Sequence, residues 1–236
     1  MSSGAVSVAT NSIVFASASS QSLTATGKTN INQQKFTFAA WFKTSTVATQ
    51  ALFYLGDGTT ANRVFARINL NGTISFLGTT ASASAFTLVT SGAFADGKWH
   101  SVVFAMNTTQ AGANNRAIIY VDGVAAPLGI NTQPAQNANL SNNFAATNLI
   151  GSQQPVAGTF FNGNLAQVYY IDGQQLTPSS FITGTPGVPK TYSGSYTGTF
   201  DFFLNFANAG SLGADTSGEG NNWTPQNSPT QSTDHP

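Results

Sequence analysis

The sequence predicts an all-β protein in which two antiparallel sheets pack face to face as a β-sandwich. Short runs rich in β-branched and aromatic residues recur along the chain, and turn pairs such as Asp-Gly and Asn-Gly separate them. No stretch shows the 3.6-residue period of an amphipathic helix. Two strands alone do not form a stable unit, so the recurring strands must share sheets that cover a common core. This pattern is typical of a sandwich or jelly roll.

The most complete hairpin lies in the middle of the sequence. An Asp-Gly pair at 96–97 and another at 122–123 enclose two apolar runs, 99–106 and 117–121. Asp hydrogen-bonds its own backbone and Gly accepts positive φ, so each pair predicts a tight turn. The polar loop 107–116 between the runs has no apolar period and is expected to be exposed. The other strands are expected to assemble around this hairpin.

The run 36–43 shows the alternation of a strand with one buried face. Phe36, Phe38 and Phe42 share a face that we assign to the core. Trp41 lies on the opposite face of the same strand. We therefore expect a loop, the C-terminal segment or a partner to cover Trp41.

The remaining strands are predicted from the same signals. Two runs joined by an Asn-Gly pair at 71–72 form a further hairpin, because this pair fits the turn between antiparallel strands. A Thr-Pro pair at 177–178 predicts the start of a helical turn, and 131–143 is expected to be a long polar loop. The other predicted strands are 12–16, 22–26, 51–55, 63–70, 73–77, 86–90, 148–151 and 160–171.

The C-terminal part differs in composition, which divides the chain into a sandwich domain at 1–182 and an extension at 183–236. The extension is rich in Gly, Pro and Asn, and it contains one apolar strand at 199–206. Its outward-pointing apolar face is too large to remain in water, so we expect it to pack on the sandwich or on a neighbouring subunit. Residues 208–236 have little to bury and are predicted to form an extended arm. The side chains expected to serve packing or assembly are Trp41, Phe200, Phe202 and Phe206.

The composition narrows the function. Only 7% of the 236 residues are charged, against about 25% in a typical domain, and the net charge is zero. A basic surface for nucleic acid is therefore excluded, as are disulfides and thiolate metal sites, because the chain has no cysteine. The N-terminal residues lack the pattern of a secretory signal, and no run is long enough to span a membrane. A virion protein, folded in the host cytoplasm and released by lysis, fits these observations.

Several phrases carry a resemblance to known proteins. FTFAAWFK at 36–43, DGKWHSV at 96–102, IYVDG at 119–123 and FNGNLAQVYYIDGQQLTPSSF at 161–181 resemble, in order, a laminin-G-like domain of the concanavalin A-type jelly roll. The last phrase, with PKTYSGSYTG and LGADTSGEGNNW after it, resembles structural proteins of tailed bacteriophages. That resemblance implies a virion-surface location, as a head decoration or as part of a fibre or spike.

The same fold hosts retaining β-glucanases, so the Asp and Glu residues show whether this chain could be catalytic. Their mechanism needs two carboxyl groups about 5 Å apart, and the chain has a single glutamate, Glu219, in the Gly-rich extension. Four aspartates precede glycine and are interpreted as turn formers: Asp57, Asp96, Asp122 and Asp172. The lone His100 is interpreted as a structural hydrogen-bonding residue. We therefore predict that the protein is not an enzyme.

Two kinds of binding site remain as expectations, and no other cofactor is predicted. Relatives with the laminin-G-like fold often hold calcium at a loop edge, and the candidate ligands are Asp57, Asp215 and Glu219, which are equally explained as turn residues. Glycan binding would use exposed aromatic rings. The candidates are Trp223, Tyr192 and Tyr196.

Three functions follow from these observations. The first is a phage virion surface protein that contacts capsid or tail proteins, forms a homo-oligomer and presents a surface for host glycans. The second is a freestanding soluble lectin, and the third, least favoured, is a glycoside hydrolase. No nucleic-acid partner is expected.

Overall fold

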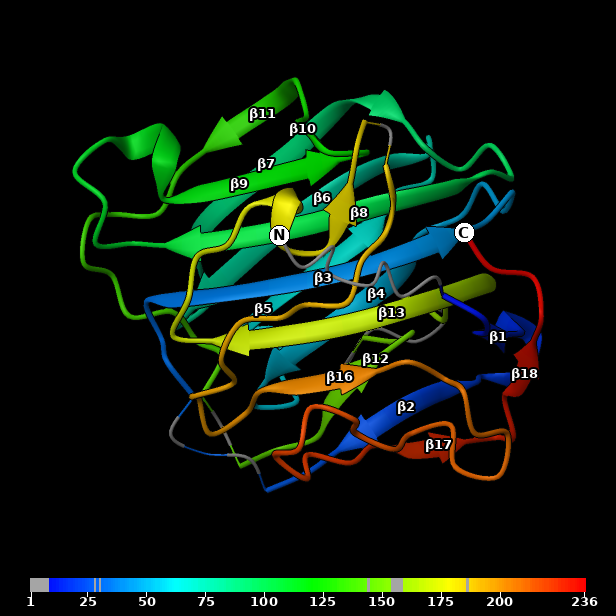
Figure 1. The fold of residues 1–236 in the computed structure, drawn as a ribbon. Helices are drawn as coiled ribbons and strands as arrows, with labels where there is room; N and C mark the ends of the chain where they lie inside the picture. The colour runs from blue at the N-terminus through cyan, green and yellow to red at the C-terminus, as the bar shows by residue number, and fades with distance from the viewer. Residues whose placement is uncertain (1–8, 28, 30, 144, 154–158, 186) are drawn as a thin grey trace, which may run out of the picture.

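The structure is a computed structural model that describes residues 9–27, 29, 31–143, 145–153, 159–185 and 187–236. The assessment of the N-terminus as lacking a secretory signal falls largely on residues 1–8 and lies outside the described part. No helix in these ranges has the length and hydropathy needed to cross a membrane. Figure 1 shows the fold, in which the regular secondary structure is almost entirely β-strand.

The strands follow one another with three single-turn 3-10 helices between them. The helices are η1 (Ser17–Ser19), η2 (Ala113–Asn115) and η3 (Pro178–Ser180). The strands are β1 (Ser12–Phe15), β2 (Ser22–Ala25), β3 (Lys35–Lys43), β4 (Gln50–Gly56), β5 (Arg63–Ile68), β6 (Thr73–Thr80), β7 (Ala83–Ala93), β8 (Trp99–Asn107), β9 (Ala117–Val121), β10 (Val124–Ala125), β11 (Leu128–Thr132), β12 (Asn148–Ile150), β13 (Gly163–Asp172), β14 (Ile182–Thr183), β15 (Val188–Pro189), β16 (Phe202–Leu204), β17 (Thr224–Gln226) and β18 (Thr230–Ser232).

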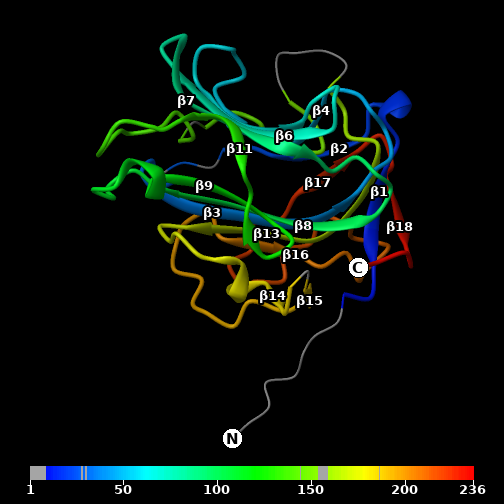
Figure 2. The same ribbon diagram turned by 90° about the horizontal axis from the view of Figure 1, so that it is seen from above.

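Two eight-stranded antiparallel sheets form the sandwich. Sheet A has the order β10-β9-β8-β3-β13-β1-β18, with β16 also paired to β13, and sheet B has the order β11-β7-β6-β5-β4-β12-β2-β17. Figure 2 shows the two sheets stacked, with the small β14–β15 hairpin on the far side of sheet A. The all-β sandwich expected from the sequence is confirmed.

The core lies between the sheets, and alternation along β3 directs side chains to both of its faces. Phe38 stacks on Phe53 of sheet B with ring centroids 4.3 Å apart, and Phe76 of β6 lies 5.1 Å from Phe104 of β8. The predicted hairpin of β8 and β9 pairs as expected, with Phe104 opposite Ile119. Interlocked aromatic rings of this kind add roughly 0.5–1.5 kcal/mol per pair beyond their buried area.

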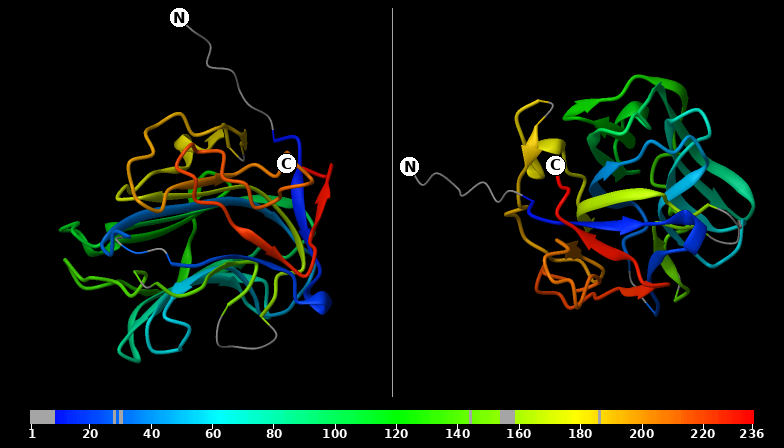
Figure 3. Two further views of the ribbon diagram at one scale, coloured as in Figure 1. Left: turned by 90° about the horizontal axis from the view of Figure 1, so that it is seen from below. Right: turned by 90° about the vertical axis from the view of Figure 1, so that its right-hand side faces the viewer.

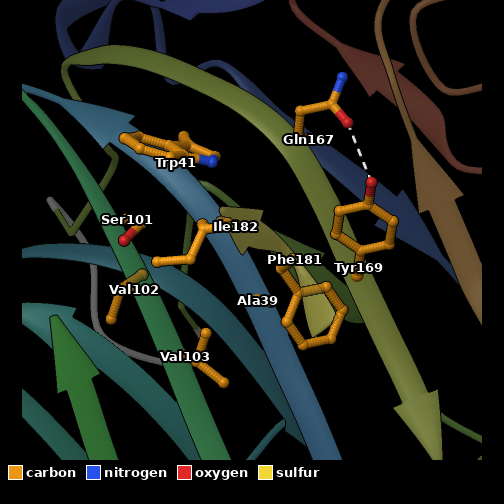
Figure 4. Close-up of a pocket in the computed structure, with 10 residues that line it drawn as sticks. Ala39, Trp41, Ser101, Val102, Val103, Gln167, Tyr169, Phe181 and Ile182 are labelled. Carbon is orange, nitrogen blue, oxygen red and sulfur yellow. Dashed lines mark hydrogen bonds between the residues drawn. The ribbon is translucent and has the colours of Figure 1, made fainter. Parts of the chain in front are cut away.

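The other face of β3 is buried beneath a third layer of chain. Trp41, Ala39 and Tyr169 of sheet A pack against Phe181 and Ile182, which lie just before and within β14. Figure 4 shows these side chains around a cavity of about 10 Å³, and the Tyr169 hydroxyl donates to Oε1 of Gln167 at 2.9 Å. Trp41 is thus covered by a segment of its own chain that includes Phe181 and Ile182, as one of the expected alternatives had it.

The C-terminal extension is part of the sandwich. Strand β16 pairs with β13 further along the strand than β1 does. Strand β17 pairs with β2, and β18 pairs with β1. Figure 3 shows these late strands beside the first strands of the chain. Phe200, Phe202 and Phe206 are buried in the main core, so they serve packing within the chain. Residues 208–236 do not form the extended arm that was predicted, because they contain several turns and their strands β17 and β18 pair with the sandwich.

Candidate functional site

A wide groove of about 560 Å³ lies on the outer face of sheet B, over β5, β6, β7 and β11. Alternation along β6 places it there, because Ile74 and Phe76 point into the core while Ser75 and Leu77 point outward. The polar lining residues are Thr49, Arg67, Asn69, Asn71, Thr73, Ser75 and Thr87, and the apolar ones are Leu70, Leu77, Val89 and Ile130.

A hydrogen-bond network holds the polar side of the groove in place. Nε of Arg67 donates to Oδ1 of Asn69 at 3.1 Å, and Nδ2 of Asn69 donates to the hydroxyls of Thr73 and Ser75 at 2.9 and 2.6 Å. The Thr73 hydroxyl in turn donates to Oδ1 of Asn71 at 2.7 Å. Because the strands fix the backbone and these bonds fix the side chains, the polar groups are arranged before any ligand arrives.

Two arginines on β5 flank one aromatic ring beside the groove. Cζ of Arg63 lies 4.6 Å from the Phe65 ring centroid, and Cζ of Arg67 lies 5.7 Å from it. Burial lowers the pKa of both guanidinium groups, and for Arg63 the neighbouring charge of Arg67 adds to the effect. Among the described residues, neither arginine forms a salt bridge with a carboxylate.

Apolar side chains stand exposed at the same groove. Leu70, at the β5–β6 turn, is 68% exposed, and Ile130 of β11 is 49% exposed. Leu77 and Val89 line the groove beside them. The groove therefore offers both fixed polar groups and apolar contact surface.

The aromatic residues proposed as glycan platforms are not exposed. Trp223 is only 4% exposed, and its ring packs on Phe200 and Phe202 with centroids 6.0 and 5.0 Å away. The prediction of a Trp223 platform is wrong, because the indole completes the core beneath the extension.

Tyr192 and Tyr196 belong to the cover over sheet A. Tyr192 is 8% exposed, stacks against Phe181 and donates its hydroxyl to Oε1 of Gln174 at 3.2 Å. Tyr196 meets Tyr192 edge to face at 5.3 Å and is partly buried. The Tyr192 ring is buried, so that prediction is wrong, whereas Tyr196 keeps part of its surface exposed and stays a prediction.

The calcium candidates are occupied by turn hydrogen bonds. Oδ1 of Asp57 accepts from the amide and hydroxyl of Thr59. The two carboxylate oxygens of Asp215 accept one bond from the Phe203 amide of β16 and three from groups of the loop that follows Asp215. Glu219 is exposed in the same loop as Asp215. No group of three or more His, Cys, Asp or Glu residues within the described ranges could hold a metal. The turn interpretation accounts for Asp57 and Asp215.

One pair of carboxyl groups is buried where the extension meets β13. Oδ1 of Asp172 accepts from the Asn32 amide at 2.8 Å, while Asp201 accepts from the amides of Asp172 and Gly198. Burial raises the pKa of Asp172 to about 6, and burial also raises the pKa of Asp201. Asp201 is fully buried and Asp172 is 3% exposed, so this pair fastens the extension to β13. Neither described pocket has an acid among its lining residues.

His100 fastens the two turns of the central hairpin. Its Nδ1 lies 2.7 Å from Oδ2 of Asp122, and its Nε2 lies 3.0 Å from Oδ1 of Asp96. Burial opposes the charged imidazolium, but the two carboxylates outweigh that effect and raise the pKa of His100. The structural role expected for this histidine and for both aspartates fits this geometry.

Sequence reasoning missed the groove, although a signal for it exists. The stretch RVFARIN at 63–69 places Arg63, Phe65 and Arg67 on one strand face. A chain with only eight Lys and Arg residues carries two of them there. The glycan platforms predicted from the sequence were Trp and Tyr residues, and neither type lines the groove.

Two antiparallel sheets with a preorganised polar groove on one outer face define a lectin-like β-sandwich. The chain belongs to the concanavalin A-like lectin/glucanases superfamily, since the Laminin_G_3 family profile matches residues 17–181. The laminin-G-like resemblance is thereby confirmed for the sandwich. No curated protein matches the sequence.

Solved structures share the fold at low identity. A candidate carbohydrate-binding protein from Bacteroides ovatus matches with a TM-score of 0.59 and 13% identity over 96% of this chain and 60% of its own. The heptameric SAP-like pentraxin of Limulus polyphemus matches at 0.53 and 16% over 73% and 80% of the two chains. Domains LG4-5 of the mouse laminin α1 chain match at 0.53 and 14%, over 78% of this chain and 49% of theirs. These likenesses concern the fold alone.

Proposed function

We propose that the protein is a non-catalytic saccharide-binding module whose ligand lies in the groove on sheet B. The observation that supports this is the combined lining of the groove, where ordered amide and hydroxyl groups stand beside exposed apolar side chains. A sugar ring presents hydroxyls at its edge and C–H groups on its faces, so both kinds of lining find a partner. Ligand sites commonly combine apolar walls with a few placed polar groups.

The absence of acids along this groove supports a binding role over a hydrolytic one. Retaining and inverting glycosidases both need two carboxyl groups flanking the scissile bond. The residues that line the groove include no Asp or Glu. An amphipathic groove without an acid pair can hold a saccharide but supplies no proton donor or nucleophile for cleaving it.

A glycan array followed by titration calorimetry tests this proposal. Thr87→Trp places an indole in the groove and is expected to abolish binding of any glycan that the array identifies, because the ring fills the space of the sugar. Thr183→Trp, on the β14–β15 hairpin over the other sheet, is the matched control and should bind as the parent does. The proposal fails if no glycan binds or if both variants bind equally well.

We also propose a setting for this module, on the surface of a tailed-phage virion as a homo-oligomer. The phrases at 189–198 and 212–223 support it, together with a surface that carries few charges. A low-charge surface can pack into an assembly without burying unpaired ions. Head decoration and fibre or spike component are both consistent with these features, and a freestanding lectin is the alternative.

Mass spectrometry and electron microscopy of purified phage particles that encode this chain test the setting. The chain is expected among the particle proteins at a copy number set by the symmetry of its location. Size-exclusion chromatography with light scattering should give an oligomeric mass for the isolated protein. A monomer that is absent from particles would favour the freestanding lectin.

A further inference from the structure

The arginines of β5 differ from the third arginine of the chain in how they are used. Arg116 donates to the backbone carbonyls of Gln110, Ala111 and Pro134, so its guanidinium is fully engaged in holding a loop. Within the described ranges, Nη1 and Nη2 of Arg67 make no such bond, and Nε and Nη1 of Arg63 are buried without a partner. Two arginines therefore carry donors that the folded chain leaves unused.

Holding these two cations together has a cost in the unliganded protein. They lie against the same ring, and burial removes part of their hydration. A guanidinium without a counter-charge in such a place is stabilised when an anion binds, because a charge-assisted hydrogen bond is about twice as strong as a neutral one. The ring keeps both planar groups oriented, so little side-chain entropy remains to be lost on binding.

The location of Arg67 connects this charge to the groove. Arg67 lines the groove beside Ser75 and Asn69, and the exposed Leu70 and Ile130 line it too. A free inorganic anion would use the arginine alone and leave the apolar side chains in water. A ligand with both an anionic group and a ring skeleton uses the whole surface.

We propose that the groove selects acidic saccharides, with the carboxylate or sulfate of the sugar bound by Arg67 and attracted by the adjacent Arg63. This rests on the proposed saccharide-binding function and adds the charge class of the ligand. Arg67 has two Nη groups that can meet two oxygens of either anion in a fork geometry. Asn69, which accepts from Nε of Arg67, donates to the hydroxyls of Thr73 and Ser75, so the polar side chains next to the guanidinium are held in place.

Calorimetric titrations with two matched pairs of ligands test this inference. Oligogalacturonate is compared with its fully methyl-esterified form, and dextran sulfate oligosaccharides with dextran oligosaccharides, so that each pair differs mainly in the anionic group. Sodium sulfate alone measures the affinity for a free anion. We expect at least about tenfold tighter binding of one acidic ligand than of its neutral counterpart, with a clear loss of affinity as salt is raised.

Substitutions assign the effect to the groove. Arg67→Gln is expected to remove most of the preference for the acidic ligand, and Arg67→Lys to retain part of it, because lysine keeps the charge but not the fork. Lys98→Gln removes the same charge from an exposed hairpin position outside the groove and should bind as the parent does. Melting temperatures show that each variant folds.

The outcomes separate this inference from the function on which it rests. Equal binding of acidic and neutral ligands, blocked by Thr87→Trp, would overturn the charge preference and keep the saccharide site. A preference for acidic ligands that Lys98→Gln reduces as much as Arg67→Gln would also overturn it, since general electrostatics would then be the cause. Binding of sulfate as tight as that of the sulfated sugar would show a site for a free anion only. No binding of any saccharide would remove both proposals.

Discussion

Replacing Phe202 by alanine measures how firmly the C-terminal extension is built into the sandwich. The ring is 1% exposed and lies 6.0 Å from Tyr170 of β13, 5.6 Å from Phe200 and 5.0 Å from Trp223. Truncating a buried Phe to Ala costs about 3–5 kcal/mol, because apolar contacts are lost and a cavity remains. With three aromatic neighbours that cannot collapse easily into the gap, we expect the upper half of that range. For a chain of this size the loss lowers the melting temperature by roughly 10 °C.

Guanidinium unfolding followed by tryptophan fluorescence is the assay. Trp223 lies beside the altered ring, Trp41 lies under the cover of sheet A and Trp99 begins β8, so a single transition in their combined signal reports one cooperative unit. Val188→Ala, at an exposed position, is the control and should change the free energy of unfolding by less than about 0.5 kcal/mol. A loss below about 1 kcal/mol for Phe202→Ala, or a second transition, would refute the view that the extension completes the core.

Three further predictions concern the pH dependence of stability, the close backbone contact at Gly163 and the ion pair between Lys43 and Asp234. The folded-state pKa of Asp172 is about 6 against 3.8 for the ordinary group, so the folded state binds the proton more tightly and the unfolding free energy falls as pH rises from about 4 to 6. The raised pKa of His100 acts in the same direction at higher pH, and denaturant titrations should show Asp172→Asn flattening the lower part of the curve. Gly163→Ala should lower the melting temperature strongly, because φ is 148° and the added Cβ would collide with the Lys43 carbonyl. Asp234→Asn should cost only about 0.2–1 kcal/mol by chemical denaturation, since its ion pair with Lys43 is partly exposed.

A fifth prediction concerns the groove and uses a substitution that keeps the shape of the side chain. Asn71→Asp keeps the acceptor oxygen that Thr73 uses but adds a negative charge to the lining. We expect the melting temperature to stay close to that of the parent while calorimetry shows weaker binding of an acidic ligand.

Alternation along a strand was the most informative signal in the sequence. It placed Phe36, Phe38 and Phe42 between the sheets and Trp41 on the other face, as the structure has them. Turn chemistry located the hairpins, because Asn-Gly and Asp-Gly pairs constrain the backbone locally. The start of η3 at Pro178 after Thr177 follows from the same kind of local rule.

What the sequence did not disclose depends on distant contacts. The segments that form β17 and β18 contain few apolar residues, and they become strands only because β1 and β2 offer free edges. The polar loop expected at 131–143 likewise begins inside β11, which pairs with the edge of β7. Trp223 resembled an exposed platform because it stands in a Gly- and Asn-rich stretch, yet Phe200 and Phe202 surround it from a distance in sequence.

The site was harder to predict than the fold, for a related reason. A binding groove on a sheet is made by neighbouring strands in register, and register is not visible in one segment. Arg67 lies opposite Ser75 only through the β5–β6 pairing, and Ile130 reaches the groove through β11. Trp223 and Tyr192, which were predicted as exposed platforms, are buried in the protein.

The pairing of the first strands with the last also affects how the protein is made. On the ribosome, β1 and β2 emerge early but have to wait for residues 224–232 before their outer edges are covered. Until then each nascent chain exposes unpaired strand edges to the other nascent chains on the same mRNA, and these edges can associate prematurely. Synthesis of this chain should therefore benefit from slow initiation or from a chaperone that shields the early strands.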